Sequence, residues 1–131
     1  MTRPDWDEYG LGIAKAVAAR ADCTRRMVGC VVLDKSHRVA ATGYNASYPG
    51  GPSCLAGQCP RGSSNVAPGD NYEYGAGTCV ATHAEANALL YADFERLRGG
   101  TAYITTDPCG GCQKLLQATP LARVVWPGGE I

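Results

Sequence analysis

Residues 101–126, TAYITTDPCGGCQKLLQATPLARVVW, decide the fold of this chain. The opening residues, Thr101–Thr105, are mostly β-branched or aromatic and predict a strand. Asp107 and Pro108 are expected to begin a helix, because Asp is a good N-cap and Pro suits the first helical position. Arg123–Trp126 predicts a further strand, and the Pro-Gly-Gly sequence that follows is expected to end it.

The upstream residues extend this pattern. Apolar residues at helical spacing, with no internal proline, predict a helix over Trp6–Arg20. Two short apolar runs predict strands at Gly29–Leu33 and Val39–Tyr44, joined by the polar turn Asp34–His37. A segment rich in Ala and Leu predicts a second helix from Thr82 to about Phe94. The order α-β-β-α-β-α-β predicts a layered α/β fold, with a mixed β-sheet of about four strands flanked by helices.

A stretch rich in Gly, Pro and Ser separates the second strand from the second helix, over Asn45–Gly77. Loops this long without secondary structure are uncommon in a compact domain and are usually functional or pinned. Cys54 and Cys59 lie inside the stretch and suggest what pins it.

Length and charge limit the function. The 131 residues predict a single domain over 1–131. Twelve basic and 12 acidic residues give zero net charge, whereas a nucleic-acid groove normally needs a basic excess to displace counterions. A small nucleotide therefore fits better than a polymer.

The cysteines point to a metal. The N-terminus has no apolar signal-peptide core, and no apolar run has the length of a membrane span. We therefore expect a cytoplasmic protein whose thiols stay reduced. Seven cysteines cannot all form disulfides within one chain, and metal ligation is the leading use for them.

Two segments carry the chemistry: His83-Ala84-Glu85 and Pro108-Cys109-Gly110-Gly111-Cys112, each at the start of a predicted helix. One helical turn places the Cys109 and Cys112 sulfurs on one side, and a helix N-terminus favours their thiolate forms. A catalytic zinc takes three protein ligands and a water. His83, Cys109 and Cys112 are the expected ligands.

Glu85 follows the histidine by two residues, close enough to face a water on the metal without ligating it. A carboxylate in that place can take a proton and deliver it to a leaving amine. The pattern H-x-E…P-C-x-x-C is the signature of the zinc nucleobase deaminases. Both halves occur here in order, which makes Glu85 the candidate catalytic residue.

Each half also has a simpler interpretation. Thr82–Glu85 matches the capping box T-x-x-E, in which Glu85 would only close a helix. An isolated C-x-x-C can be a redox motif, and an isolated histidine is more often structural than metal-bound. These interpretations would have to coincide to explain the whole pattern.

Four further cysteines are candidates for a second, structural zinc site, because four thiolates close such a site: Cys23, Cys54, Cys59 and Cys79. The alternative is that they are small buried apolar side chains. Cys30, inside a predicted strand, is assigned to the core.

The residues above resemble the deoxycytidylate deaminases of the cytidine deaminase superfamily, from about Trp6 to Trp126. The shared motifs are R-x-V-G at Arg26–Gly29, T-G-Y-N at Thr42–Asn45, C-x-x-x-H-A-E-x-N-A at Cys79–Ala88 and Y-I-T-T-D-P-C-x-x-C at Tyr103–Cys112. The resemblance implies a cytidine-deaminase-like fold, Asn45 against the deoxyribose and the Ala84 backbone at the pyrimidine edge. It also implies a second zinc near the four further cysteines.

The chain departs from the family in two places. The loop G-Y-N-G-x-P-x-G appears as Gly43–Gly50 with Ala46 at its fourth position and the proline shifted to Pro49. Alanine disfavours positive φ, so we expect a different loop path. The chain also ends at Ile131, sooner than its relatives, which leads us to expect that a partner subunit covers one sheet edge in a homo-oligomer, dimer to hexamer.

The expected reaction is the hydrolysis of dCMP to dUMP and ammonia. Arg25 and Arg26 are candidate phosphate contacts, because an arginine fork suits phosphate oxygens, although adjacent arginines are also common as a solvated surface pair. Another substrate would keep the chemistry: cytidine, a modified dCMP or single-stranded nucleic acid. A non-catalytic, zinc-stabilised nucleotide-binding module is the alternative of another class, and it would not need Glu85.

Overall fold

Five strands form one mixed sheet in the computed structural model, which describes residues 2–63 and 78–131. They are β1 (Gly29–Leu33), β2 (Val39–Tyr44), β3 (Thr101–Ile104), β4 (Arg123–Trp126) and β5 (Gly129–Glu130). The spatial order is β2-β1-β3-β4-β5, with β3 and β4 parallel and the other pairs antiparallel. The four predicted strands are confirmed, and β5 is an additional one. Gly128, at φ 90°, makes the tight turn that folds β5 back onto β4.

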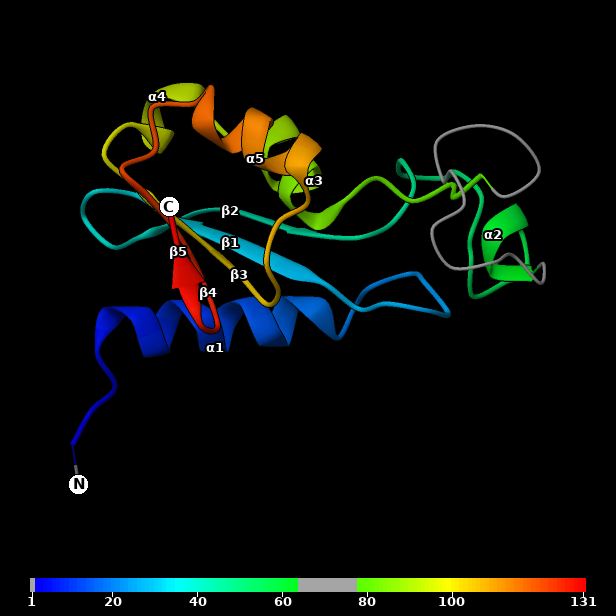
Figure 1. Ribbon diagram of the computed structural model, residues 1–131, viewed down its shortest axis with the longest axis horizontal. Helices are drawn as coiled ribbons and strands as arrows, with labels where there is room; N and C mark the ends of the chain where they lie inside the picture. The colour runs from blue at the N-terminus through cyan, green and yellow to red at the C-terminus, as the bar shows by residue number, and fades with distance from the viewer. Residues whose placement is uncertain (1, 64–77) are drawn as a thin grey trace.

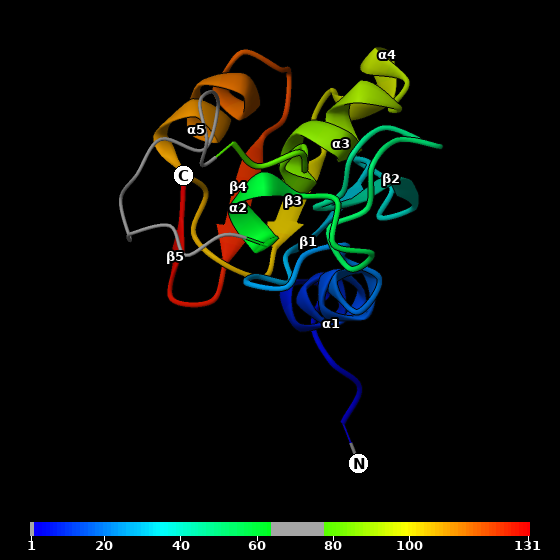
Figure 2. The same cartoon turned by 90° about the vertical axis from the view of Figure 1, so that its right-hand side faces the viewer.

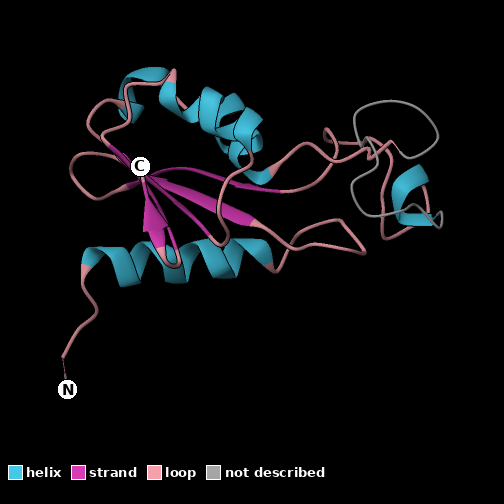
Figure 3. Ribbon diagram, viewed as in Figure 1, coloured by secondary structure: helices cyan, strands magenta, loops and turns pink. Residues whose placement is uncertain are grey.

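Helices cover both faces of this sheet (Figures 1 and 3). The long α1 (Trp6–Ala18) lies along one face, and its N-cap Asp5 accepts a hydrogen bond from the backbone N–H of Glu8 at 2.8 Å. The other face carries α3 (Ala84–Leu90), α4 (Phe94–Leu97) and α5 (Gly110–Gln117), opposite α1 (Figure 2), while the short α2 (Pro60–Ser63) stands away from the sheet (Figure 1). The predicted layered α/β fold is confirmed.

Strand β1 is the centre of the core, since all five of its residues are buried. Alternate side chains of a strand point to opposite faces. Cys30 and Val32 accordingly pack with α3 and α5 residues, whereas Val31 and Leu33 pack with α1. The assignment of Cys30 to the core is confirmed, and burial raises the pKa of its thiol.

The prediction of a single helix from Thr82 to about Phe94 is wrong in its bounds. It is two helices, because the chain turns after Leu90 and Asp93 caps a new helix by accepting the backbone N–H of Glu95 at 3.0 Å. The first of them begins only at Ala84, because the preceding Thr82 pairs with Ala46 in a short β-bridge.

The N-cap predicted at Asp107 is also wrong. Helix α5 starts at Gly110, and its N-cap is Cys109, whose sulfur accepts the backbone N–H of Cys112 at 3.4 Å. A thiolate can fill the place that an aspartate oxygen usually takes, and the helix therefore starts two residues later than the Asp-Pro signal indicates.

The long loop is only partly as expected. It contains α2, a turn of helix that the composition did not predict, and its residues 64–77 lie outside the described residues. Near its start, Ala46 pairs with Thr82 through hydrogen bonds of 3.2 and 2.9 Å. No non-glycine residue of the described ranges except His37 has a positive φ, so Ala46 is unstrained.

Gly43 sets how closely α3 approaches the sheet. A Cβ atom there would overlap the carbonyl oxygen of Ala84 and the backbone nitrogen of Ala88, and neither backbone can move without shifting the helix. Because α3 begins at the candidate site, this contact also determines where that site lies.

We predict opposite effects for two Gly→Ala changes. Gly43→Ala should lower the free energy of unfolding by about 1–3 kcal/mol, because it overpacks the helix against the strand. Gly12→Ala, on the open side of α1, should raise it by about 0.5–1 kcal/mol, because alanine favours a helix and nothing lies within 4 Å of the new Cβ. Chemical denaturation measures both, and equal effects would contradict the close packing of α3 at Gly43.

Candidate active site

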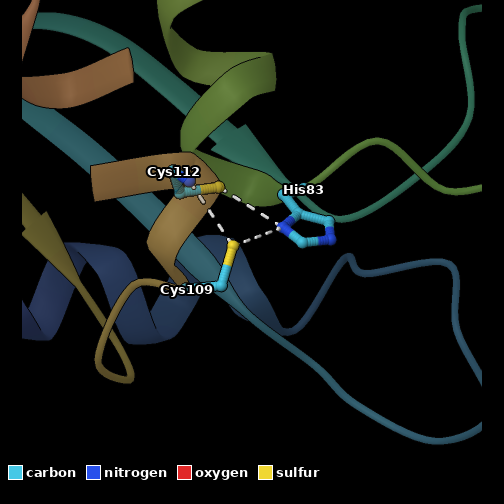
Figure 4. A group of neighbouring side chains, drawn as sticks. All are labelled: His83, Cys109 and Cys112. Atoms are coloured by element: carbon cyan, nitrogen blue, oxygen red, sulfur yellow. Dashed lines mark hydrogen bonds between the residues drawn. The ribbon is translucent and has the colours of Figure 1, made fainter. Parts of the chain in front are cut away.

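The structure brings His83, Cys109 and Cys112 together from two helices (Figure 4). The Nδ1 atom of His83 lies 3.3 Å from the Cys112 sulfur and 3.5 Å from the Cys109 sulfur. Among the described residues, this is the single group of three or more His, Cys, Asp or Glu side chains whose ligand atoms all lie within 4.8 Å. Its members are the three ligands expected from the sequence.

This geometry fits a zinc ion. Ligand atoms about 2.0–2.3 Å from a tetrahedral zinc lie about 3.3–3.8 Å from one another. The two nitrogen–sulfur distances of 3.3 and 3.5 Å fall in this range. One nitrogen and two sulfurs are also ligands that zinc prefers, and three protein ligands leave a fourth position open.

The two helix N-termini place these side chains. His83 is the N-cap of α3 and makes no side-chain cap bond, and its imidazole faces the two sulfurs of α5. Cys109 is the N-cap of α5, and Cys112 lies in the first turn. Unpaired N–H groups and the helix dipole favour negative sulfur at both positions.

The surroundings of the Cys112 thiol raise its pKa strongly. Burial raises its pKa, and the neighbouring negative charge of Glu85 raises it further. Without a cation, Cys112 therefore holds its proton at neutral pH. A bound metal would take the place of that proton, because the ligand is the thiolate.

Glu85 lies beside the sulfur of Cys112, within hydrogen-bonding contact, and only 4% of its surface is exposed. The capping-box alternative is contradicted, because the N-cap is His83 rather than Thr82. Glu85 occupies the second position of α3, so its carboxylate is buried next to the triad. A carboxylate is rarely buried without a functional or structural partner, and here the neighbours are the candidate metal ligands.

A cavity of about 270 Å³ opens in front of this group. Of the residues predicted for the site, all but Cys112 line it: Cys23, Arg25, Arg26, Asn45, Cys54, Cys59, Cys79, His83, Ala84, Glu85 and Cys109. The cavity is thus lined by two of the triad residues and Glu85, and also by the arginines and the further cysteines. Its size suits a small ligand rather than a polymer.

Asn45 holds one wall of the cavity. Its side-chain oxygen accepts the Val28 N–H at 2.9 Å, and its amide nitrogen donates to the Arg26 carbonyl at 2.9 Å. These bonds attach the segment that carries the two predicted arginines to the end of β2. Asn45 therefore shapes the cavity, whereas the deoxyribose contact implied by the resemblance stays a prediction.

The four further cysteines, Cys23, Cys54, Cys59 and Cys79, all line this cavity, and together they are called the cysteine wall. All seven cysteines lie within the described residues, and none of them forms a disulfide there. Cys59 and Cys79 are in hydrogen-bonding contact, and electrostatic interactions connect Cys54 and Cys79 with Cys59 and Cys23. The four sulfurs are nevertheless not as close together as the triad.

Two residues around the cavity were not among those predicted from the sequence, Asn87 and Arg61. Asn87 donates from its side-chain nitrogen to the carbonyls of Tyr44, Ala46 and Thr82, at 2.8, 3.2 and 3.3 Å, and so fixes the strand that leads into His83. Its position, one helical turn after His83, was the available signal. Arg61 lines the cavity from α2, a helix that the composition of the loop gave no means of finding.

Among the described residues, none of the helices combines the length and the apolar composition that a membrane span requires.

The site combines a histidine and two cysteines that can hold one zinc ion with a buried glutamate beside them. Together with the fold, it defines a zinc-dependent deaminase. The chain belongs to the cytidine and deoxycytidylate deaminase family, whose zinc-binding region matches residues 4–127.

Several known proteins are similar to the chain. The deoxycytidylate deaminase of Mycobacterium phage D29 is 53% identical over 128 residues, which cover 97% of this chain and 98% of the relative. The deoxycytidylate deaminase of Schizosaccharomyces pombe is 38% identical over 125 residues, but the chain spans only 37% of that longer relative.

Among solved structures, the dCMP deaminase of cyanophage S-TIM5 in its apo form superposes with a TM-score of 0.66. The superposition covers 95% of this chain and 84% of that one at 21% identity, and it shows that the fold is shared.

Proposed function

We propose that the chain catalyses the hydrolytic deamination of dCMP to dUMP and ammonia, with zinc held by His83, Cys109 and Cys112. The observation that carries the proposal is the buried Glu85 carboxylate beside this triad, in the wall of a cavity of nucleotide size. A purely structural zinc site has no need of that carboxylate. The choice of dCMP as the substrate is supported by the relatives that are named deoxycytidylate deaminases.

Bound zinc would supply a Lewis acid that lowers the pKa of a coordinated water to about 7. Glu85 then acts on the protons. Its carboxylate takes one proton from the attacking water and delivers it to ring N3. It then takes the second proton of that water from the new C4 hydroxyl and transfers it to the departing amino nitrogen. Water adds at C4, the C4–N bond breaks, and ammonia leaves, so one water is consumed for each ammonia formed.

The remaining cavity residues would orient the nucleotide. The backbone of Ala84, which is fully buried between His83 and Glu85, is proposed to meet the pyrimidine edge. Asn45 would meet the deoxyribose, and Arg25 and Arg26 would meet the 5′-phosphate. Support for these roles comes from the lining of a single cavity by all four residues.

Glu85→Gln should retain the catalytic zinc but lose deamination by a factor on the order of 10²–10⁴, because the amide cannot relay protons. Metal analysis and steady-state assays with dCMP measure the two effects. The matched control is Glu95→Gln, which removes an exposed carboxylate that pairs with Arg98, and it should leave the rate unchanged. Near-normal turnover of Glu85→Gln would mean that this carboxylate has only a structural role.

A second, structural zinc is part of the proposal, held by Cys23, Cys54, Cys59 and Cys79. Support comes from backbone N–H groups that already point at the sulfurs: Thr24 donates to Cys54 at 3.3 Å, and Arg25 and Arg26 donate to Cys23 at 3.3 and 3.4 Å. Such bonds stabilise thiolates, the form that binds zinc. Burial acts against ionisation of Cys59, but the backbone N–H groups around it lower its pKa overall.

We expect two zinc ions per chain in protein purified without chelator. Cys54→Ser should reduce the number to one, because it removes a ligand of the second site only. The control Cys30→Ala removes a buried cysteine of the core and should leave two. A value of one in the wild type, unchanged in Cys54→Ser, would contradict the second site.

The nucleotide should be preferred to the nucleoside. We expect kcat/KM for dCMP to exceed that for deoxycytidine, and the ratio to fall in Arg25→Ala and in Arg26→Ala, because charge-assisted hydrogen bonds to phosphate are lost. Parallel assays of both substrates measure the ratio. Equal processing of the two by the wild type would instead indicate a nucleoside deaminase with the same zinc chemistry.

A homo-oligomer, a cytoplasmic location and a single domain over 1–131 also stay predictions. The exposed aromatic side chains of Trp6 and Tyr9 on α1, and of Tyr91 and Phe94 beside α4, supply apolar surface that a subunit contact can use.

A further inference from the structure

A third arginine lines the cavity. Arg61 lies on α2, 35 residues after Arg26 in the sequence, yet both border the same cavity, as does Arg25. Arg61 is half-buried, whereas the other two are exposed. Arg25 and Arg26 follow Cys23 closely in the sequence, and Arg61 follows Cys59 by two residues.

The backbone N–H of each arginine donates a hydrogen bond to a cysteine sulfur. The N–H groups of Arg25 and Arg26 donate to the Cys23 sulfur at 3.3 and 3.4 Å. The N–H of Arg61 contributes a hydrogen bond to the Cys59 sulfur, along with its own bond to the Thr78 carbonyl at 3.0 Å. The sulfurs of the cysteine wall therefore fix the backbone positions of all three arginines.

The neighbouring packing leaves little freedom at Arg61. A Cβ on the next residue, Gly62, would lie 2.6 Å from the Cys54 sulfur and 3.1 Å from the Thr24 hydroxyl. The turn that presents Arg61 is thus packed against the segment that presents Arg25. Two segments distant in sequence are held as one surface.

The charges of the cavity are compatible with an anion at this surface. Three arginines line it, against the carboxylates of Glu85 and Asp107. Glu85 lies at the triad, where the base is proposed to react. A nucleotide placed with its base there must direct its phosphate toward some other part of the cavity, and the arginines are the cationic side chains of that lining.

We propose that Arg61 completes, with Arg25 and Arg26, a three-arginine clamp for the 5′-phosphate, and so determines the preference for a nucleotide over a nucleoside. This inference rests on the proposed function. The planar guanidinium forks suit the oxygens of a phosphate dianion, and a clamp built from two segments can contact it from two sides. The cysteine wall would affect substrate specificity indirectly, because its sulfurs fix the backbone positions of the three arginines.

The test compares Arg61→Ala and Arg61→Lys with the control Arg98→Ala, whose arginine pairs with Glu95 away from the cavity lining. Calorimetry gives the affinities for the product dUMP and for deoxyuridine, with no turnover during the measurement. In Arg61→Ala we expect the ratio of these affinities to fall by about 10- to 100-fold, the range for a hydrogen bond to a charged group. Arg61→Lys should recover part of it, and Arg98→Ala should keep the wild-type ratio.

Steady-state assays and metal analysis separate the alternatives. We expect the loss in Arg61→Ala to appear as a raised KM for dCMP with two zinc ions retained. An unchanged dUMP-to-deoxyuridine ratio, with or without a loss of zinc, would overturn the clamp and assign Arg61 to balancing the charge of the cysteines. If the wild type itself fails to deaminate dCMP, the proposed function fails. If it prefers dCMP and Arg61→Ala keeps that preference, only the clamp fails.

Discussion

The site depends on two helix N-termini that meet over one face of the sheet. Helix α3 packs against β1 and β2 and contacts α5, and each of α3 and α5 carries its candidate metal ligands at its N-terminal end. N-terminal N–H groups and the helix dipole attract negative charge, which suits sulfur ligands. If either helix shifted by one turn, about 5.4 Å, the ligand atoms would no longer lie within reach of one ion.

The N-cap residues show how structure and function share the same positions. Ser, Thr, Asp and Asn are the usual N-caps, but His83 and Cys109 stand there in this chain. Cys109 still caps its helix through its sulfur, whereas His83 makes no side-chain cap bond. The start of α3 is instead held by Asn87, which donates from within the helix to the Thr82 carbonyl, and by the bridge between Ala46 and Thr82. The imidazole is therefore positioned without serving as a cap.

The cavity joins two groups of cysteines with different tasks. On one side, Cys112 and Glu85 are buried together, and their mutual repulsion makes a cation favourable there. On the other side, sulfurs accept backbone N–H groups from the arginine-bearing turns. In the proposed function, the first group serves the reaction and the second organises the surface that would meet the rest of the nucleotide. Such a division explains why a small chain needs so many cysteines without any disulfide.

The sequence by itself determined the strands and the identity of the triad. Alternation and β-branched runs identify strands locally, and the four predicted strands are found at or within one residue of their predicted bounds. The order and spacing of His83, Cys109 and Cys112 identified the three side chains that the structure brings together as candidate ligands, because one helical turn fixes the relation of the two sulfurs. Tertiary structure decided what local signals cannot encode. Because Thr82 pairs with Ala46, α3 starts two residues later than predicted, and the sulfur of Cys109 replaces Asp107 as the N-cap of α5. The folded chain also places Arg61 in the lining of the same cavity as Arg25. Each of these outcomes depends on contacts between residues far apart in the sequence, and their energy exists only once the chain has folded.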